Sequence, residues 1–257
     1  MGQDVAQLLT IPVSHYCEKA RWALQRAGIP YQEVRHMQGF HYPYSLWWAR
    51  SVTVPVLRVG AQVLADSTEI LRWVDTQTPA ESRLFPDEPT QRQAVEDLED
   101  RFDRGIGVDV RRWVYQRHLS AGQSKWLIEQ TAQGVPGYEA PLVHRLLPFL
   151  QPLLRARVQG LSDGEVEGGL AQTRATLDQL ATRLSDGRRY LCGDRFTAAD
   201  LTLASLGSFL VMPREYGIRL PEPSELPPRM RAEVESFRAH PTGQFILRLY
   251  AERQALR

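Results

Sequence analysis

The sequence predicts an α/β domain over residues 1–78, a linker over residues 79–89 and an all-helical domain over residues 90–257. Two observations predict this division. Short apolar runs of strand length alternate with helical patterns in the first segment, and the strand pattern disappears in the last. Between them, three prolines stand among charged residues, which is the composition of a connecting segment.

The first domain is predicted to open with a buried strand and a capped helix. Residues 6–13 form an apolar run of strand length. Apolar positions at residues 16–27 then follow helical spacing, with Ser14 before them as the N-cap. Gly28 and Pro30 follow and are expected to end the helix.

The middle of this domain is predicted to hold a strand, an irregular segment and a hairpin. Residues 31–35 alternate as a strand does, whereas the aromatic segment 40–48 fits neither period. Two short apolar runs, at residues 54–59 and 63–65, flank a turn at Gly60. We therefore expect them to pair as antiparallel strands.

The remaining elements are predicted to be helical. Residues 66–75 carry apolar side chains on one face, and Asp66 with Glu69 has the spacing of a capping box. In the second domain, apolar positions step at helical spacing through residues 94–102 and again through 166–184. Helices are therefore expected to dominate the second domain.

Composition excludes several classes of function. Lys and Arg number 31 against 30 Asp and Glu, and the net charge of +1 gives no field that would attract nucleic acid. Cys17 and Cys192 have neither the number nor the spacing of a disulfide framework or a zinc site, so we expect no metal and a reducing, cytoplasmic setting. No apolar stretch has the length of a membrane span, so no membrane partner is expected.

The first candidate site lies at residues 14–17, Ser-His-Tyr-Cys, where the first strand passes into the first helix. The opening N–H groups of a helix lack internal partners and form its positive end, which favours a thiolate or another anion. Thioredoxin-like folds place a Cys-x-x-Cys motif at such a turn, but here the first position is Ser14. Dithiol exchange is excluded, and a hydroxyl remains that can donate a hydrogen bond to the sulfur of another molecule.

Four segments, in this order, resemble the signature of the cytosolic glutathione transferase superfamily, and most closely its bacterial, serine-type members. They are residues 14–21 (SHYCEKAR), 53–57 (TVPVL), 65–70 (ADSTEI) and 196–202 (FTAADLT). In the last of these, Thr197 and Asp200 have the spacing of a capping box that starts a buried helix. The resemblance implies a thioredoxin-like first domain that binds glutathione as co-substrate, an all-α second domain, and a homodimer.

The resemblance implies that Ser14 stabilises the glutathione thiolate, with Tyr16 and Cys17 as the alternates. The helix pattern alone favours the interpretation of Ser14 as an N-cap without a catalytic role, and the other motifs reverse that preference. Tyr16 is also interpreted as a packing residue and Cys17 as an inert, partly buried thiol. We expect His15 at the surface, because no partner carboxylate is visible for it in the sequence.

The resemblance also implies a binding site for the rest of glutathione. A backbone beside a cis proline pairs with the cysteinyl unit, an acidic residue followed by serine receives the γ-glutamyl end, and a basic residue meets the glycine carboxylate. Thr53 stands where that basic residue is usual, so Arg50 or His41 is expected to serve instead. The implied binding residues are Val54, Pro55, Asp66, Ser67, Thr53, Arg50 and His41.

The second domain is expected to form the wall of a hydrophobic substrate pocket. By family analogy and helical position, the candidates are Phe102, Trp113 and Tyr115. The adjacent pair Arg111 and Arg112 is expected on a solvated helix face.

The predicted function is glutathione transfer to, or reduction of, small hydrophobic electrophiles in detoxification, with glutathione peroxidase chemistry as a side activity. The alternative is a non-catalytic protein that holds glutathione or an apolar ligand in the same pocket. Residues 119–165 are interpreted as a lineage-specific elaboration of the second domain.

Overall fold

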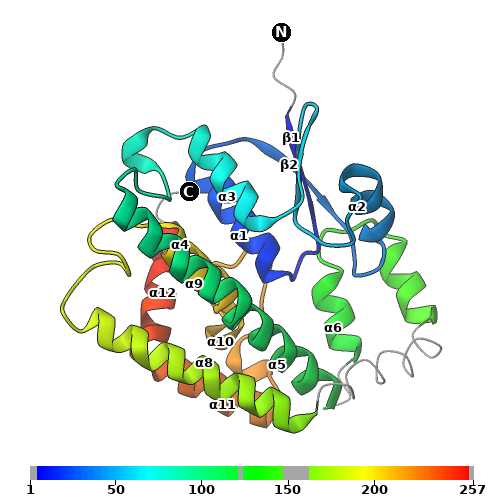
Figure 1. Cartoon of the computed structure of the whole chain (residues 1–257). Coiled ribbons are helices and arrows are strands. Elements are labelled where there is room, and N and C mark those ends of the chain that lie inside the picture. Colours follow the sequence, from blue (N-terminus) through cyan, green and yellow to red (C-terminus); the bar gives the residue numbers. More distant parts are fainter. Residues whose placement is uncertain (1–4, 121–123, 147–161, 255–257) are drawn as a thin grey trace.

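The structure, a computed structural model, describes residues 5–120, 124–146 and 162–254. A small mixed sheet lies at one end of the molecule and a group of helices fills the rest (Figure 1). This arrangement confirms the predicted fold class. The elements are β1 Ala6–Thr10, α1 His15–Arg26, β2 Tyr31–Arg35, α2 His41–Ala49, β3 Val56–Val59, β4 Gln62–Leu64, α3 Ser67–Thr76, α4 Pro89–Arg104, α5 Ile106–Ser120, α6 Ser124–Thr131, α8 Asp163–Leu184, α9 Ala198–Leu206, α10 Ser208–Val211, α11 Pro228–Ala239 and α12 Pro241–Gln254.

The sheet has four strands in the order β2-β1-β3-β4. Strand β1 is parallel to β2 and antiparallel to β3, and β3 and β4 form the predicted hairpin. Leu8 of β1 stands opposite Leu57 of β3, and both side chains are completely buried. Strand β1 ends at Thr10 rather than at residue 13, because Ser14 N–H bonds back to Ile11 C=O at 3.0 Å and turns the chain.

Helix α1 lies between the sheet and the second domain, where it packs against α3 and α9 (Figure 1). Its contacts with the second domain include charged side chains. Glu18 and Arg253 of α12 form an ion pair, although both are buried. Lys19, also fully buried, pairs with Glu99 and Asp103 of α4. The two domains therefore share an interface made partly of buried ion pairs.

The predicted linker is more firmly packed than its composition indicates. The two carboxylate oxygens of Asp75 accept hydrogen bonds from Leu84 N–H at 2.7 Å and Phe85 N–H at 2.8 Å. Leu84 and Phe85 are buried, and Leu84 C=O accepts a bond from Ala198 N–H at the start of α9. This segment thus connects α3 to α9 as well as to α4.

The predicted capping box of the second domain is present at the start of α9. The Asp200 carboxylate accepts hydrogen bonds from the N–H and the hydroxyl of Thr197, both at 2.9 Å. Its other oxygen accepts from Leu191 N–H at 2.8 Å. The box therefore also fixes the loop that precedes α9.

Helix α2 is the element that the sequence did not predict. Pro43 is tolerated because it lies in the first turn, where N–H groups have no partner within the helix. The helix buries His41 and Ser45 but exposes Tyr42, Leu46 and Trp47, so burial does not follow apolar character here. Apolar and aromatic side chains stand at most of its positions, so no amphipathic pattern was recognisable.

Among the described residues, no helix combines the length and the apolar character that a membrane span requires.

Candidate functional site

The start of α1 places a serine hydroxyl at a helix N-terminus. Ser14 is the N-cap, with extended backbone angles, and its Oγ accepts a hydrogen bond from Cys17 N–H at 3.3 Å. The side chain is half-buried. Because Oγ acts as an acceptor in this bond, its proton remains to be donated to an incoming acceptor.

Tyr16 connects α1 to the end of α4. Its hydroxyl donates to Asp103 C=O at 2.9 Å, and burial together with the Asp103 carboxylate raises its pKa to about 12. The hydroxyl proton is thus already used in a contact between the domains. This position agrees with the interpretation of Tyr16 as a packing residue.

Cys17 and His15 are both internal. Burial raises the pKa of the Cys17 thiol to about 11, and the nearby charge of Arg21 offsets only part of that effect. His15 is buried against Phe209, at 5.6 Å between ring centroids, so the expectation that it lies at the surface is wrong. Burial lowers its pKa to about 3, and Arg111 lowers it further, so the ring is neutral at physiological pH. Neither side chain supplies a thiolate or a cation at this pH.

The segment that precedes β3 has the predicted cis peptide bond before its proline. The Val54–Pro55 peptide bond is cis. Pro55 is buried, whereas Val54 is half-buried. In the part of the chain that the structure describes, the Val54 backbone makes no hydrogen bond, so its N–H and C=O are available to an extended peptide.

The start of α3 presents a carboxylate and a buried hydroxyl. One oxygen of the exposed Asp66 accepts bonds from Thr68 N–H at 2.8 Å and Glu69 N–H at 3.1 Å, which is the Asp66 half of the predicted capping box. Ser67 is buried. A cavity of about 560 Å³ lies between α3 and α4 beside these residues. Its lining is rich in carboxylates and consists of Asp66, Thr68, Glu69, Arg72, Gln93, Glu96, Asp97, Glu99, Asp100, Asp103 and Arg104.

The three candidates for the glycine carboxylate lie in very different surroundings. His41 is buried, its Nδ1 accepts from Gly39 N–H and its Nε2 donates to Val52 C=O, both at 3.2 Å. Burial lowers its pKa, so this ring supports the backbone and offers no positive charge. Thr53 is exposed and its hydroxyl bonds to Ser51. Arg50, at the end of α2, is an exposed cation.

The candidates for the hydrophobic wall require a correction. Phe102 and Trp113 are completely buried, and Trp113 Nε1 donates to Glu233 at 2.8 Å. Both are core residues, because the faces of α4 and α5 that carry them pack inside the helical domain. Tyr115 is 38% exposed and is the one of the three that reaches the surface.

A different face of α5 borders the first turn of α1. A Cβ atom on Gly107 would lie 2.4 Å from the Tyr16 hydroxyl oxygen, so a side chain at this position would displace the hydroxyl. One turn further, the Arg111 guanidinium carbon lies 5.8 Å from the centroid of the Tyr16 ring. Arg111 was expected on an ordinary solvated face, and its place beside α1 was not predicted.

Comparisons with known proteins agree with this geometry. Residues 8–82 match the family described as Glutathione S-transferase, N-terminal domain. Residues 163–232 match the family described as Glutathione S-transferase, C-terminal domain, and the two matches together cover more than half of the chain. The chain belongs to the glutathione transferase superfamily.

Solved structures, glutathione transferases among them, share the fold. The theta class enzyme from Xanthomonas axonopodis pv. citri, solved with glutathione bound, is 21% identical with a TM-score of 0.56 over 93% of this chain and 95% of that chain. Beta-etherase LigF from Sphingobium sp. is 15% identical with a TM-score of 0.61 over 97% and 100%. A glutathione S-transferase from Sinorhizobium meliloti is 18% identical with a TM-score of 0.58 over 96% and 92%. The sequence has no significant match among curated proteins.

This glutathione transferase chain has a second contact between its domains that the sequence did not reveal. Glu139, completely buried, bonds through one carboxylate oxygen to His36 Nδ1 and accepts from Met37 N–H through the other at 2.7 Å. His36 also stacks on Tyr44 of α2, with 4.0 Å between ring centroids. Glu139 lies in the region interpreted as an elaboration, and its partners precede it by about a hundred residues, so no local signal connects them.

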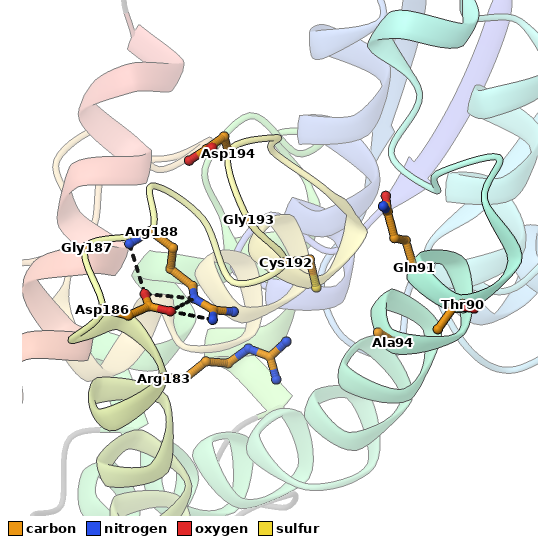
Figure 2. Close-up of a pocket in the computed structure, with 10 residues that line it drawn as sticks. All are labelled: Thr90, Gln91, Ala94, Arg183, Asp186, Gly187, Arg188, Cys192, Gly193 and Asp194. Carbon is orange, nitrogen blue, oxygen red and sulfur yellow. Dashed lines mark hydrogen bonds and ion pairs between the residues drawn. The ribbon is translucent and has the colours of Figure 1, made fainter.

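A cavity of about 560 Å³ lies at the other end of α4 (Figure 2). It is bordered by the start of α4 and the loop between α8 and α9, where Arg188 is held by Asp186 and Cys192 is half-buried. Gln91 in this cavity and Asp103 beside Tyr16 are separated by about 18 Å along α4, given the rise per residue of a helix. The cavity is therefore separate from the start of α1. Its lining residues are Thr90, Gln91, Ala94, Arg183, Asp186, Gly187, Arg188, Cys192, Gly193 and Asp194.

Within residues 5–120, 124–146 and 162–254, no group of three or more His, Cys, Asp or Glu side chains is placed to hold a metal ion.

Proposed function

We propose that this chain is a glutathione transferase in which the Ser14 hydroxyl stabilises the thiolate of bound glutathione. The observation that carries the proposal is the position of Ser14 as N-cap, with its oxygen accepting from Cys17 N–H and its proton left to donate. The two alternates are less suitable. Tyr16 already donates to Asp103 C=O, and the Cys17 thiol is buried with a raised pKa.

The energies involved are of the required size. Lowering a thiol pKa from near 8.5 by about two units takes roughly 2.7 kcal/mol of preference for the thiolate. A hydrogen bond to a charged group supplies about 1.5 to 3 kcal/mol, and a helix N-terminus adds roughly 0.3 to 1 kcal/mol. Ser14 and the positive end of α1 together are sufficient.

The remaining groups of glutathione have matching partners in the first domain. The unpaired backbone of Val54, beside Pro55, suits the cysteinyl unit. Asp66 and Ser67 suit the γ-glutamyl end, because the carboxylates around them favour its ammonium group. Arg50, as the exposed cation of its loop, suits the glycine carboxylate better than the buried His41 or the neutral Thr53.

In the proposed reaction the thiolate sulfur attacks a small hydrophobic electrophile. With an aryl halide, a sulfur–carbon bond forms and the halide leaves with its bonding electrons. The residues around the first turn of α1 hold the thiol in its ionised form and orient it. No metal is needed for this step.

The test is to titrate the bound glutathione thiol by ultraviolet absorbance in variants of Ser14. We expect the thiol pKa to rise by about one to two units in Ser14→Ala and in Ser14→Gly, since each removes the hydroxyl. Ser14→Gly is the better-matched variant, because glycine as an N-cap costs only a few tenths of a kcal/mol in place of about 1 for alanine. Ser14→Thr should restore the low value, and Tyr16→Phe should leave it unchanged. An unchanged pKa in both Ser14→Ala and Ser14→Gly would exclude Ser14 as the activating residue.

Turnover separates the enzyme from a non-catalytic binding protein. Activity with an aryl halide, an isothiocyanate or an organic peroxide supports the transferase, and the peroxide reports the peroxidase side activity. Loss of all three activities with retention on immobilised glutathione would favour the binding protein. We also propose a homodimer, which a monomeric mass in solution would contradict.

A further inference from the structure

One face of α5 lies beside the first turn of α1. Gly107, Arg111 and Tyr115 are spaced four residues apart, and residues with this spacing lie above one another on a helix. Gly107 contacts the Tyr16 hydroxyl, and Arg111 lies over the Tyr16 ring. Arg111 and Tyr115 are exposed, so this face continues from the contact between the domains to solvent.

The Arg111 guanidinium lacks a counter-ion. In the described ranges 5–120, 124–146 and 162–254, no ion pair or hydrogen bond involves its side chain. The charge of its neighbour Arg112 acts on two carboxyl groups: it opposes part of the rise that burial causes in the pKa of Asp109, and it contributes to the lowered pKa of Glu165. Of the two consecutive arginines, Arg112 thus acts on nearby acidic residues, whereas Arg111 acts on His15 and Tyr16.

Two of the carboxylates that act on Tyr16 already have partners, and a third packs against α8. Asp103 is bound by Lys19 at 2.8 Å, and Asp66 accepts from two N–H groups of α3. Asp109 packs beside Gly169 of α8, where a Cβ would meet its carboxylate at 2.8 Å. The positive charge of Arg111 is therefore available to a ligand.

The field of Arg111 reaches the start of α1. It contributes to the lowered pKa of His15 and offsets part of the rise in the pKa of Tyr16, the two residues that follow Ser14. The N-terminus of α1 is itself a positive end. The N-terminus of α1 and the Arg111 guanidinium thus both border the place where the sulfur of glutathione would be held. Arg111 is the one that the second domain contributes.

We propose that Arg111 gives the proposed glutathione site, on the side that α5 borders, a preference for substrates that carry a carboxylate, such as halogenated aromatic acids. The planar guanidinium binds a carboxylate through two parallel hydrogen bonds, which fixes the orientation of an aromatic acid as well as its position. This inference rests on the proposed function and specifies the substrate class of the same site.

The experiment compares two matched aryl halides, 4-chloro-3,5-dinitrobenzoate and its methyl ester. Each value of kcat/KM is divided by the rate constant of the same compound with free glutathione, so that intrinsic reactivity cancels. We expect the normalised value to favour the carboxylate, and Arg111→Ala to reduce this preference about tenfold or more. Arg112→Ala, the matched control, should leave the preference unchanged, and Arg111→Lys should retain part of it.

The outcomes distinguish this inference from the proposed function. Turnover of both compounds without a carboxylate preference, or an equal loss for both in Arg111→Ala, would overturn the inference while the transferase stands. Absence of turnover would contradict the proposed function. In that case, tryptophan fluorescence is used to measure the binding of unreactive 3,5-dinitrobenzoate and of its methyl ester. This measurement tests the anion site without turnover. Weaker binding of the acid alone in Arg111→Ala supports the anion site, and equal binding of both ligands by wild type and variant excludes it.

Discussion

Helix α1 meets charged side chains of the helical domain in two regions that differ in burial. On one side, Glu18 and Lys19 are completely buried and each is paired with a residue of the second domain. On the side of Tyr16, the neighbouring charge is that of Arg111, which is exposed and has no ionic partner among the described residues.

The difference separates two kinds of role. Removing a charge from water costs several kcal/mol, so a buried pair persists only when both partners remain in place. The pairs around Glu18 and Lys19 therefore fix how the domains pack. An exposed, unpaired cation contributes little to folding and keeps its hydrogen-bond donors for a ligand.

The largest effect is expected for Glu18→Gln. Glu18 bonds to Arg21, to Arg253 and to Gly217 N–H, so neutralising it leaves two buried guanidinium groups without this carboxylate. We expect the free energy of unfolding to fall by about 3 to 5 kcal/mol. Urea denaturation measures the change. Glu235→Gln, on an exposed position of α11, is the control, and an equal effect in both variants would contradict the prediction.

A smaller loss is expected at the other contact between the domains. Glu139→Ala removes the acceptor for Met37 N–H and the partner of His36, and should destabilise the protein by about 1 to 3 kcal/mol. Glu139→Gln retains an acceptor and should cost less. Thermal unfolding of both variants tests this order, and an equal loss in both would show that the charge of Glu139 rather than its hydrogen bonds holds the segment.

Glu33 should make part of the stability depend on pH. Burial alone would raise its pKa, but Arg21, Arg35 and Thr10 together hold the pKa of Glu33 below its usual value. Because the unfolded chain binds this proton at higher pH than the folded chain, stability is present above the ordinary carboxyl pKa and is lost as pH falls through the folded value. Denaturation curves from neutral to acid pH should show a shallower acid loss in Glu33→Gln than in wild type. If the free energy of unfolding falls equally with pH in both proteins, Glu33 does not contribute to the acid loss of stability.

The smallest change in stability is expected for Arg111→Ala, within about 0.5 kcal/mol. An exposed side chain without an ion pair contributes little to the folded state. Urea denaturation beside Glu18→Gln provides the direct comparison. A fall of more than about 2 kcal/mol in the free energy of unfolding would show that Arg111 stabilises the fold, as the buried ion pairs do.

Much of the fold could be predicted from patterns of a few consecutive residues. The strands of the first domain, the Ser14 cap and the box formed by Thr197 and Asp200 follow from short-range spacing. The cis bond at Val54–Pro55 was predicted from the motif rather than from physics, since most X-Pro bonds are trans. Features that depend on a few consecutive residues were therefore recognisable.

Features that depend on how helices face one another were not recognisable. Phe102 and Trp113 were expected at a pocket wall, but their helices turn them into the core. Arg111 and Arg112 look alike in the sequence, and only the position of α1 distinguishes them. The bond between Glu139 and His36 joins distant segments without any shared local signal. The roles of the glutathione-binding residues stay predictions until a ligand is seen.

The place of the Tyr16 hydroxyl beside α5 depends on a missing carbon atom. With 2.4 Å between the Tyr16 oxygen and the position that a Cβ of residue 107 would take, any side chain there would displace that hydroxyl. The bond from Tyr16 to Asp103 C=O, and with it one contact between α1 and the second domain, thus depends on a position that presents no chemical group of its own. Surveys of polar or aromatic lining residues would pass over it.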